Sequence, residues 1–188
     1  RPSTRRPRAP STARAGHAGH AENALVLREL GPGEERVLDE VLAGLSDHSR
    51  YLRFRSPFRQ VPPLVRRALS AVDGRRHVAL VAVAGPRPIG IARYVDVGDA
   101  RAELAVEVVD AWHGHGVGTR LLRALRERAV DAGYRELAAE VLAENDAVLA
   151  LLRTVFPIQV VARDGAELTL TLPLTDDWTC DPALLLCA

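Results

Sequence analysis

The segment that most constrains the fold is residues 112–120, which read W-H-G-H-G-V-G-T-R. Apolar and polar residues alternate before it, over residues 102–109, and apolar residues recur at helical spacing after it, over residues 121–133. This order predicts a strand, a glycine-rich turn and a helix. The glycines let backbone N–H groups converge without a Cβ in the way, and a helix leaves about four N–H groups unpaired in its first turn. The segment therefore predicts a phosphate or pyrophosphate site.

Three phosphate-binding sequence patterns compete for this turn. A Walker loop requires G-x-x-x-x-G-K-[ST], and the chain contains no lysine. A dinucleotide fingerprint requires G-x-G-x-x-G, whereas the glycines here run G-x-G-x-G and the preceding strands lack crossover helices. The third pattern, [Q/R]-x-x-G-x-[G/A], is met from His113 to Gly118 except at its first residue.

A strand A-E-L-A-V-E-V-V-D-A-W precedes the turn, and A-E-V-L-A-E-N follows its helix. With the turn, these segments resemble the GNAT superfamily of acyl-CoA-dependent N-acetyltransferases. The segments L-S-D-H-S-R-Y-L-R-F-R-S-P and H-V-A-L-V-A-V are most similar to actinobacterial-type protein and small-amine acetyltransferases. The resemblance covers about residues 24–174. It implies transfer of an acetyl group from acetyl-CoA, as co-substrate, directly to a primary amine of a protein lysine or a small molecule.

Periodicity and turn residues divide the chain into elements. Strands are predicted at residues 24–30, 77–84, 88–97, 101–109, 136–142, 158–163 and 166–174. Helices are predicted at residues 34–45, 62–72, 121–133 and 145–155, with a further short one within 45–57. Two-residue links are expected at Gly85-Pro86, Gly98-Asp99 and Asp164-Gly165. The expected class is an α/β (α+β) GNAT fold, with a mixed, mostly antiparallel sheet of six to seven strands flanked by about four helices.

Composition suggests one domain between two tails. All 25 basic residues are arginine, and five of them precede the first acid, Glu22. We expect residues 1–22 to be a disordered basic tail, although the segment also resembles an organelle transit peptide. Residues 23–174 would form the acetyltransferase domain. Residues 175–188 would form a C-terminal tail, whose apolar residues 184–186 either dock on the domain or bind a partner.

The same composition excludes several classes of partner. Without the first tail, 20 arginines face 24 acids, so the domain has no general attraction for nucleic acid. No apolar run approaches the ~20 residues that cross a bilayer, so no membrane anchor is expected. The two cysteines lie in the last nine residues, outside any metal or redox spacing, which favours a cytoplasmic location.

Two acids in the strand before the turn are candidate general bases. An attacking amine must first be neutral, and the developing oxyanion then needs a hydrogen-bond donor. Strand alternation puts Glu103, Ala105 and Glu107 on one face. The resemblance assigns the base to the acid of the A-E-L stretch, Glu103, and Glu107 is the second candidate. The two lie about 13 Å apart, too far to share one proton, and the alternative is that both are solvated or paired with arginines.

The resemblance also assigns residues to the cofactor. The pyrophosphate of CoA would lie on backbone amides of His113, Gly114, His115, Gly116, Val117, Gly118 and Thr119. The pantetheine arm would lie like an extra strand between the fourth and fifth strands, on the backbone of Val108 and Val109. Asn145 would reach this arm, although it fits equally well as the N-cap of the helix that it begins.

Several residues depart from the family pattern. His113 and His115 replace the usual Gln or Arg, and a neutral imidazole offers a phosphate less charge than a guanidinium. The H-x-H spacing could bind a metal, as could His17 with His20, but no further ligand cluster is visible, so no metal is expected. The family's frequent tyrosine after Asn145, which protonates the leaving thiolate, is replaced by Leu151-Leu152.

These departures leave a second hypothesis, a non-catalytic acyl-CoA-binding regulatory module. A third hypothesis is nucleotide or dinucleotide binding. The acceptor amine also stays open. Four arginines between residues 50 and 59 would suit an acidic or carboxylate-bearing acceptor, or would form a solvated face. An exposed edge on the C-terminal strands would make a homodimer reasonable.

Overall fold

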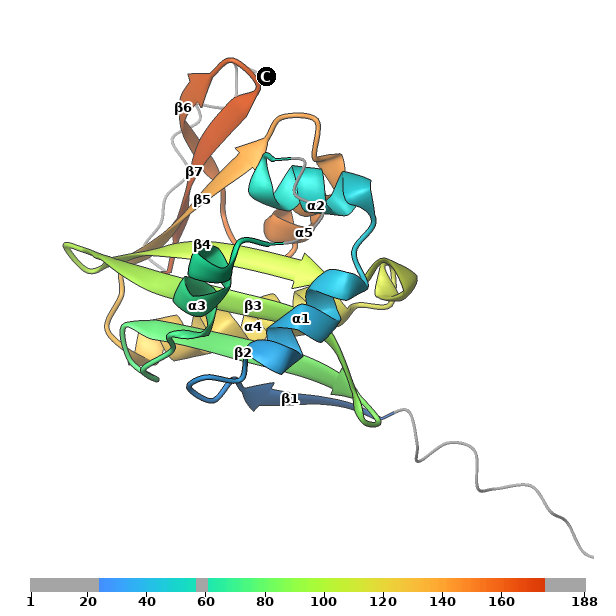
Figure 1. Cartoon of the computed structure of the whole chain (residues 1–188). Helices are drawn as coiled ribbons and strands as arrows, with labels where there is room; N and C mark the ends of the chain where they lie inside the picture. Colours follow the sequence, from blue (N-terminus) through green and yellow to red (C-terminus); the bar gives the residue numbers. More distant parts are fainter. Residues whose placement is uncertain (1–23, 57–60, 175–188) are drawn as a thin grey trace, which may run out of the picture.

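The structure is a computed structural model that describes residues 24–56 and 61–174 (Figure 1). Its seven strands form one sheet in the order β1-β2-β3-β4-β5-β7-β6. The strands are β1 (Leu25–Glu29), β2 (His77–Ala84), β3 (Arg87–Gly98), β4 (Arg101–Val108), β5 (Glu136–Leu142), β6 (Gln159–Asp164) and β7 (Glu167–Pro173). The helices in this part of the chain are α1 (Glu35–Ala43), α2 (Asp47–Phe54), α3 (Pro63–Ser70), α4 (Val117–Asp131) and α5 (Asp146–Arg153), with a short 3-10 helix at Asp110–Trp112.

The predicted fold class is confirmed. Every neighbouring pair of strands is antiparallel except β4 and β5, which run parallel because the crossover helix α4 joins them. The short links after β2 and β3 produce the meander that the turn signals predicted. Five α-helices flank the sheet in the described residues, where about four were expected.

Among the boundaries that differ from the prediction, three have a specific local cause. Helix α4 begins at Val117, four residues early, because Gly116 takes a left-handed φ of +75° and ends the turn there. The link after β3 is Asp99-Ala100, with φ angles of 53° and 57°, and the last hairpin turns at Gly165-Ala166. Both turns therefore lie one residue later than predicted, because the residue before each turn still pairs across the hairpin.

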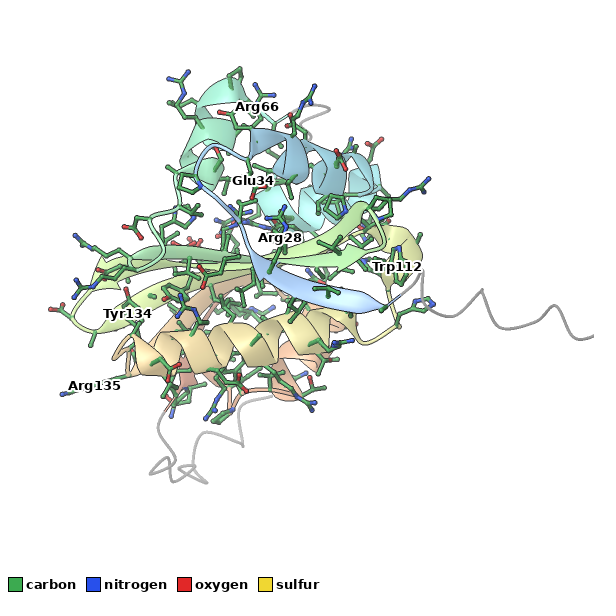
Figure 2. All side chains as sticks on the ribbon, turned by 90° about the horizontal axis from the view of Figure 1, so that it is seen from below. Arg28, Glu34, Arg66, Trp112, Tyr134 and Arg135 are labelled. Atoms are coloured by element: carbon green, nitrogen blue, oxygen red, sulfur yellow. The ribbon has the colours of Figure 1, made fainter. Side chains whose placement is uncertain are left out.

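The sheet has a hydrophobic core on each face, because β2 and β3 bury alternate residues on opposite sides. Helix α4 contributes Leu121, Leu122 and Leu125 to the core on one face. Helix α1 contributes Leu38 and Val41 to the core on the other. Figure 2 shows these two layers, with α4 on one side of the sheet and α1 and α3 on the other.

The sheet is divided between β4 and β5. Only three residue pairs join these strands: Arg101 with Glu136, Ala102 with Leu137, and Glu103 with Ala138. Beyond them the strands separate, and β5, β7 and β6 turn away from β1–β4 (Figure 1). Parallel strands gain backbone hydrogen bonds only where they lie side by side, so the later part of β4 has an unpaired edge.

Candidate active site

A cleft of about 560 Å³ lies where β4 and β5 separate. Its walls come from α2, β4, the glycine turn, the start of α4, β5 and α5. Ten of the twelve candidate site residues line it: Glu103, Glu107, Val108, His113, Gly114, Gly116, Val117, Gly118, Thr119 and Asn145. Val109 and His115 do not line it.

The free edge of β4 faces this cleft. Val109 donates its backbone N–H to the carbonyl of Ile89 at 2.9 Å, so the backbone groups of Val109 point toward β3. Because these groups alternate along a strand, those of Val106 and Val108 point toward β5, where no paired residue lies opposite them. An extended ligand could add to β4 here as an extra strand does. The sequence prediction had named Val108 but not Val106.

The turn after β4 presents unpaired backbone amides. The N–H groups of Gly114, Gly116, Val117, Gly118 and Thr119 have no acceptor within residues 24–56 and 61–174. Gly114 and Gly116 both have a φ of +75° and open space where a Cβ would stand. The amides of His113 and His115 instead bond to the carbonyls of Asp110 and Trp112. Five of the seven predicted amides are therefore available to an anion at a helix N-terminus.

The α1–α2 corner holds the start of this turn. A Cβ on Gly44 would stand 2.7 Å from both methyl carbons of Val109, so only glycine permits this contact. The backbone N–H of Asp110 donates to the carbonyl of Gly44 at 3.2 Å, and Ser46 donates its N–H to Asp110 Oδ2 at 3.3 Å. These contacts fix the turn to the scaffold on the α1 side. Figure 2 shows Trp112, at the start of the turn, at the opposite end of the sheet from Tyr134.

The two histidines of the turn bond back to its own backbone. His113 Nε2 lies 2.8 Å from the carbonyl oxygen of Val108, so it donates to one of the free groups on the β4 edge. His115 Nδ1 lies 2.8 Å from the carbonyl of His113, and its ring packs edge-on against Trp112. In the part of the chain that the structure describes, no three metal-ligating side chains cluster. His17 and His20 lie outside the described residues.

Glu103 is exposed, lines the cleft and lies at the last pair before β4 and β5 separate. Its side-chain carboxylate has no hydrogen bond or ion pair with any other described residue. A carboxylate in this position is free to accept a proton from a ligand in the cleft.

Glu107 lies on the same face of β4 but is buried and paired. Its Oε1 accepts from Arg93 at 2.8 Å and its Oε2 from Arg53 at 3.0 Å, and only 1% of its side chain is exposed. Burial alone would raise the pKa of Glu107, but the two guanidinium groups outweigh it and lower the pKa below its ordinary value. Glu107 is therefore held ionised. It is paired with two arginines, which is the alternative that the sequence analysis had left open for this residue.

Sequence reasoning did not identify Arg93. It lies on β3 within the buried run I-G-I-A-R-Y, with 2% of its side chain exposed, and also donates to the carbonyl of Leu69 at 2.6 Å. A buried arginine requires an acidic partner, so this charge inside an apolar strand was a usable signal.

Asn145 and Leu151 form the α5 side of the cleft. The Oδ1 of Asn145 accepts from the backbone N–H of Val148 at 3.2 Å, so this residue caps α5 while it also lines the cleft. Leu151 and Leu152 both line the cleft, and Leu152 is fully buried in the core. A Cβ on Gly118 would stand 2.8 Å from Leu151 Cδ2, so α4 and α5 meet closely here.

Neither Tyr51 nor Tyr94 lines the cleft, so neither is placed to protonate a leaving thiolate. Tyr94 is 1% exposed on the α4 side of the sheet, packs edge-on against Tyr134, and has its pKa raised by burial to about 12. Tyr51 is 41% exposed on α2.

Among the helices of residues 24–56 and 61–174, none has the length and apolar character of a membrane-spanning segment.

The chain resembles several solved structures. The GNAT domain of S. lividans PAT is 24% identical with a TM-score of 0.73, and the match covers 84% of this chain and 99% of that one. The yncA protein of Salmonella typhimurium, solved with its cofactor acetyl-CoA, is 19% identical with a TM-score of 0.60, over 85% and 99%. Ribosomal-protein-alanine N-acetyltransferase from Brucella melitensis is 23% identical with a TM-score of 0.63, over 79% and 99%.

Residues 45–155 match the sequence model of the acetyltransferase (GNAT) family, which is more than half of the chain. The matched segment runs from just before α2 to just after α5 and contains every residue that lines the cleft. The match confirms the resemblance inferred from the glycine turn and its flanking strands. By this match and by its fold, the chain belongs to the GNAT family of acetyltransferases.

Proposed function

We propose that this chain transfers an acetyl group from acetyl-CoA to a primary amine by direct attack, with Glu103 as the general base. The observation that carries the proposal is the position of Glu103. An exposed carboxylate with no partner among the described residues lies where β4 and β5 separate, in the same cleft as the unpaired amides of the turn. Glu107 is the weaker candidate for the base, because its lowered pKa makes it a poor proton acceptor.

The residues of the cleft fit acetyl-CoA. The five unpaired amides from Gly114 to Thr119 would hold the pyrophosphate, and the open φ-positive glycines leave room for it. The free edge of β4 at Val106 and Val108 would bond the pantetheine amides, with the side-chain amide of Asn145 opposite. When bound, acetyl-CoA would supply the acetyl group, as a thioester, that is transferred to the amine.

Glu103 would take one proton from the acceptor's ammonium group, directly or through a water molecule, and so free its lone pair for attack. A backbone N–H on the free edge of β4 would stabilise the negative charge that develops on the thioester oxygen. Attack forms the N–C bond of a tetrahedral intermediate, the C–S bond then breaks, and the nitrogen loses its second proton while the thiolate of CoA takes one up. No tyrosine lines this cleft within the described residues, so we propose that a water molecule passes this second proton from the nitrogen to the thiolate.

Thermal unfolding tests the first part of the proposal. A ligand at 100 times its Kd adds ~2.7 kcal/mol to the stability of the folded state, so saturating acetyl-CoA is expected to raise the melting temperature. NAD and ATP serve as comparison ligands. A shift with either of them and none with acetyl-CoA would favour the nucleotide-binding alternative.

Turnover of Glu103→Gln tests the base. Loss of a positioned general base typically costs about 10²–10⁴ in rate, while acetyl-CoA affinity should stay the same. Glu127→Gln, an exposed acid on α4 away from the cleft, is the matched control. Full activity in Glu103→Gln, together with unchanged binding, would remove Glu103 from this role.

The second candidate function, a non-catalytic acyl-CoA-binding module, is favoured by one feature. Leu151, one of the α5 residues that line the cleft, offers no proton for a leaving thiolate. Both candidates predict acetyl-CoA binding. Inertness of the wild-type protein toward a broad amine panel, with binding intact, would favour the module.

A homodimer is also proposed, through the outer strand β6. This strand lies at the edge of the sheet, and its Val160 and Val161 are each 55% exposed. Exposed edge strands pair readily with another chain. Light scattering on the purified protein measures the mass, and Val160→Lys is expected to convert a dimer to a monomer.

A further inference from the structure

The arginines of α2 differ in what they bind. Arg50 donates to the carbonyl of Leu42 at 3.1 and 3.2 Å, and Arg55 is held between Glu140 and Glu167 at 2.7 Å each. The acids that flank Arg55 therefore satisfy its charge. Arg59 lies outside the described residues. Arg53 is therefore the remaining described arginine of the basic run at residues 50–59.

Arg53 uses only one edge of its guanidinium group. Its Nε donates to Glu107 Oε2 at 3.0 Å, and among the described residues neither of its Nη atoms has a hydrogen-bond or ion-pair partner. The side chain lines the cleft and is 23% exposed. A guanidinium presents its two Nη groups as a planar fork, which matches the two oxygens of a carboxylate.

The charges around this fork do not cancel. Arg53 and Arg93 share one carboxylate, that of Glu107, so the three groups together carry a formal charge of +1. Arg93 is nearly fully buried, so the uncompensated charge meets the cleft at Arg53. An anionic group on a ligand would neutralise the positive charge at the free Nη edge of Arg53.

Glu103 supplies the opposite charge on the same face of β4. Strand spacing places Glu103 and Glu107 about 13 Å apart, and the side chain of Arg53 reaches from Glu107 into the cleft between α2 and β4. The cleft therefore contains one free carboxylate and one free guanidinium edge, at separate points along one strand. Such a pair matches a molecule that carries both an ammonium and a carboxylate group.

We propose that the acceptor is an amino acid, an amine that carries its own carboxylate, and that Arg53 binds that carboxylate while Glu103 meets the amine. This inference rests on the proposed acetyltransferase function. It makes Arg53 a specificity-determining residue and Arg93 a positioning residue, which acts through Glu107.

Matched acceptors test the proposal. Each amino acid is compared with the amine that lacks only its carboxylate: leucine with isoamylamine, 4-aminobutyrate with propylamine, and 6-aminohexanoate with pentylamine. The three lengths measure the span between the two charged groups. Steady-state kinetics give the ratio of kcat/KM within each pair, and calorimetric titration into the protein saturated with CoA gives the ratio of affinities without requiring turnover.

The variants are Arg53→Lys and Arg50→Gln. Lysine keeps a positive charge beside Glu107 but has no planar fork, so the protein should fold while it loses the preference. We expect at least one amino acid to be preferred to its partner by about tenfold or more, and Arg53→Lys to remove most of that preference through KM. Arg50→Gln, on the same helix but outside the cleft, should retain the preference.

Two results would overturn the proposal. One is that the plain amines bind and react as well as the amino acids. The other is that Arg53→Lys weakens both members of a pair equally. If no acceptor is acetylated but an amino acid binds in an Arg53-dependent way, the carboxylate site stands and the acetyltransferase proposal fails. If the plain amines are acetylated with no preference, the reverse holds.

Discussion

Glu107 and Arg93 form a 2.8 Å ion pair across β4 and β3, with 1% and 2% of their side chains exposed. Neither charge can be solvated if its partner is removed. The pair also orients Glu107 toward Arg53, which links the interior of the sheet to the wall of the cleft. Its energetics can therefore be measured separately from activity.

Glu107→Gln should be strongly destabilising, because it leaves the Arg93 guanidinium buried without a counter-charge. Breaking a buried pair from one side costs about 3–5 kcal/mol. The double variant Arg93→Met with Glu107→Gln should lose less, since it removes the buried charge as well. Urea unfolding of the three proteins measures the difference, and equal losses in the single and double variants would contradict this account.

The same carboxylate should make stability depend on pH. The folded-state pKa of Glu107 is lowered from its ordinary value of 4.5, because the charges of Arg93 and Arg53 outweigh burial. A lowered pKa contributes stability above pH 4.5 that is lost as the pH falls from there through the folded-state pKa. Urea unfolding across this window should show a steeper loss for the wild-type protein than for Glu107→Gln. Parallel curves for the two proteins would exclude Glu107 as the source.

Gly116→Ala should weaken acetyl-CoA binding by about tenfold or more, because a φ of +75° strains any residue with a Cβ and the amides of the turn would move. Gly165→Ala is the matched control, since Gly165 also has a positive φ, +57°, but lies in the β6–β7 turn away from the cleft. Both variants should lose roughly 1–2 kcal/mol of stability. Calorimetric titration should show an affinity loss in Gly116→Ala alone.

Gly44→Ala should destabilise the protein by about 1–3 kcal/mol, because the added Cβ would overlap the stiff, branched side chain of Val109. Truncation of that side chain gives it room. The double variant with Val109→Ala should therefore lose less than the sum of the two single variants. Denaturant unfolding of all four proteins closes the cycle, and additive losses would show that the two residues do not interact.

Ala100→Gly should stabilise the protein by about 0.5 kcal/mol, because relief of a left-handed alanine outweighs the added freedom of glycine in the unfolded chain. Ala100 has a φ of +57° in the β3–β4 turn. Ala132→Gly is the control, since Ala132 has an ordinary φ of −77° at the end of α4. Thermal unfolding should move in opposite directions for the two variants.

Much of the fold could be predicted because its signals are local. Strands β2 and β5 have the predicted bounds, since alternation ends there at a turn or a glycine. The two hairpin turns were misplaced by one residue because an Asp-Gly or Gly-Asp pair marks a turn but not which residue still pairs across it. Helix α4 began early because Gly118 and Thr119 read as part of a loop while they lie in the first helical turn.

The site was less predictable where it depends on contacts between distant residues. Strand alternation placed Glu103 and Glu107 on one face, but only the arrangement of β3 and α2 separates a paired Glu107 from an unpaired Glu103. Likewise, the sequence marked a basic run on α2 without indicating that Glu140 and Glu167 hold Arg55 while Arg53 keeps a free edge. Val109 points to β3 because register, not residue type, decides which backbone groups face the cleft.

The three residue pairs between β4 and β5 act as a short seam between two otherwise separate half-sheets. An elongated ligand bound along β4 would contact both half-sheets and make the junction between them more rigid. The rate of amide hydrogen exchange should then fall in β5 and β7, including at residues that the ligand does not contact. We therefore expect ligand binding in the cleft to increase the rigidity of the C-terminal half of the molecule, in addition to its role in the reaction.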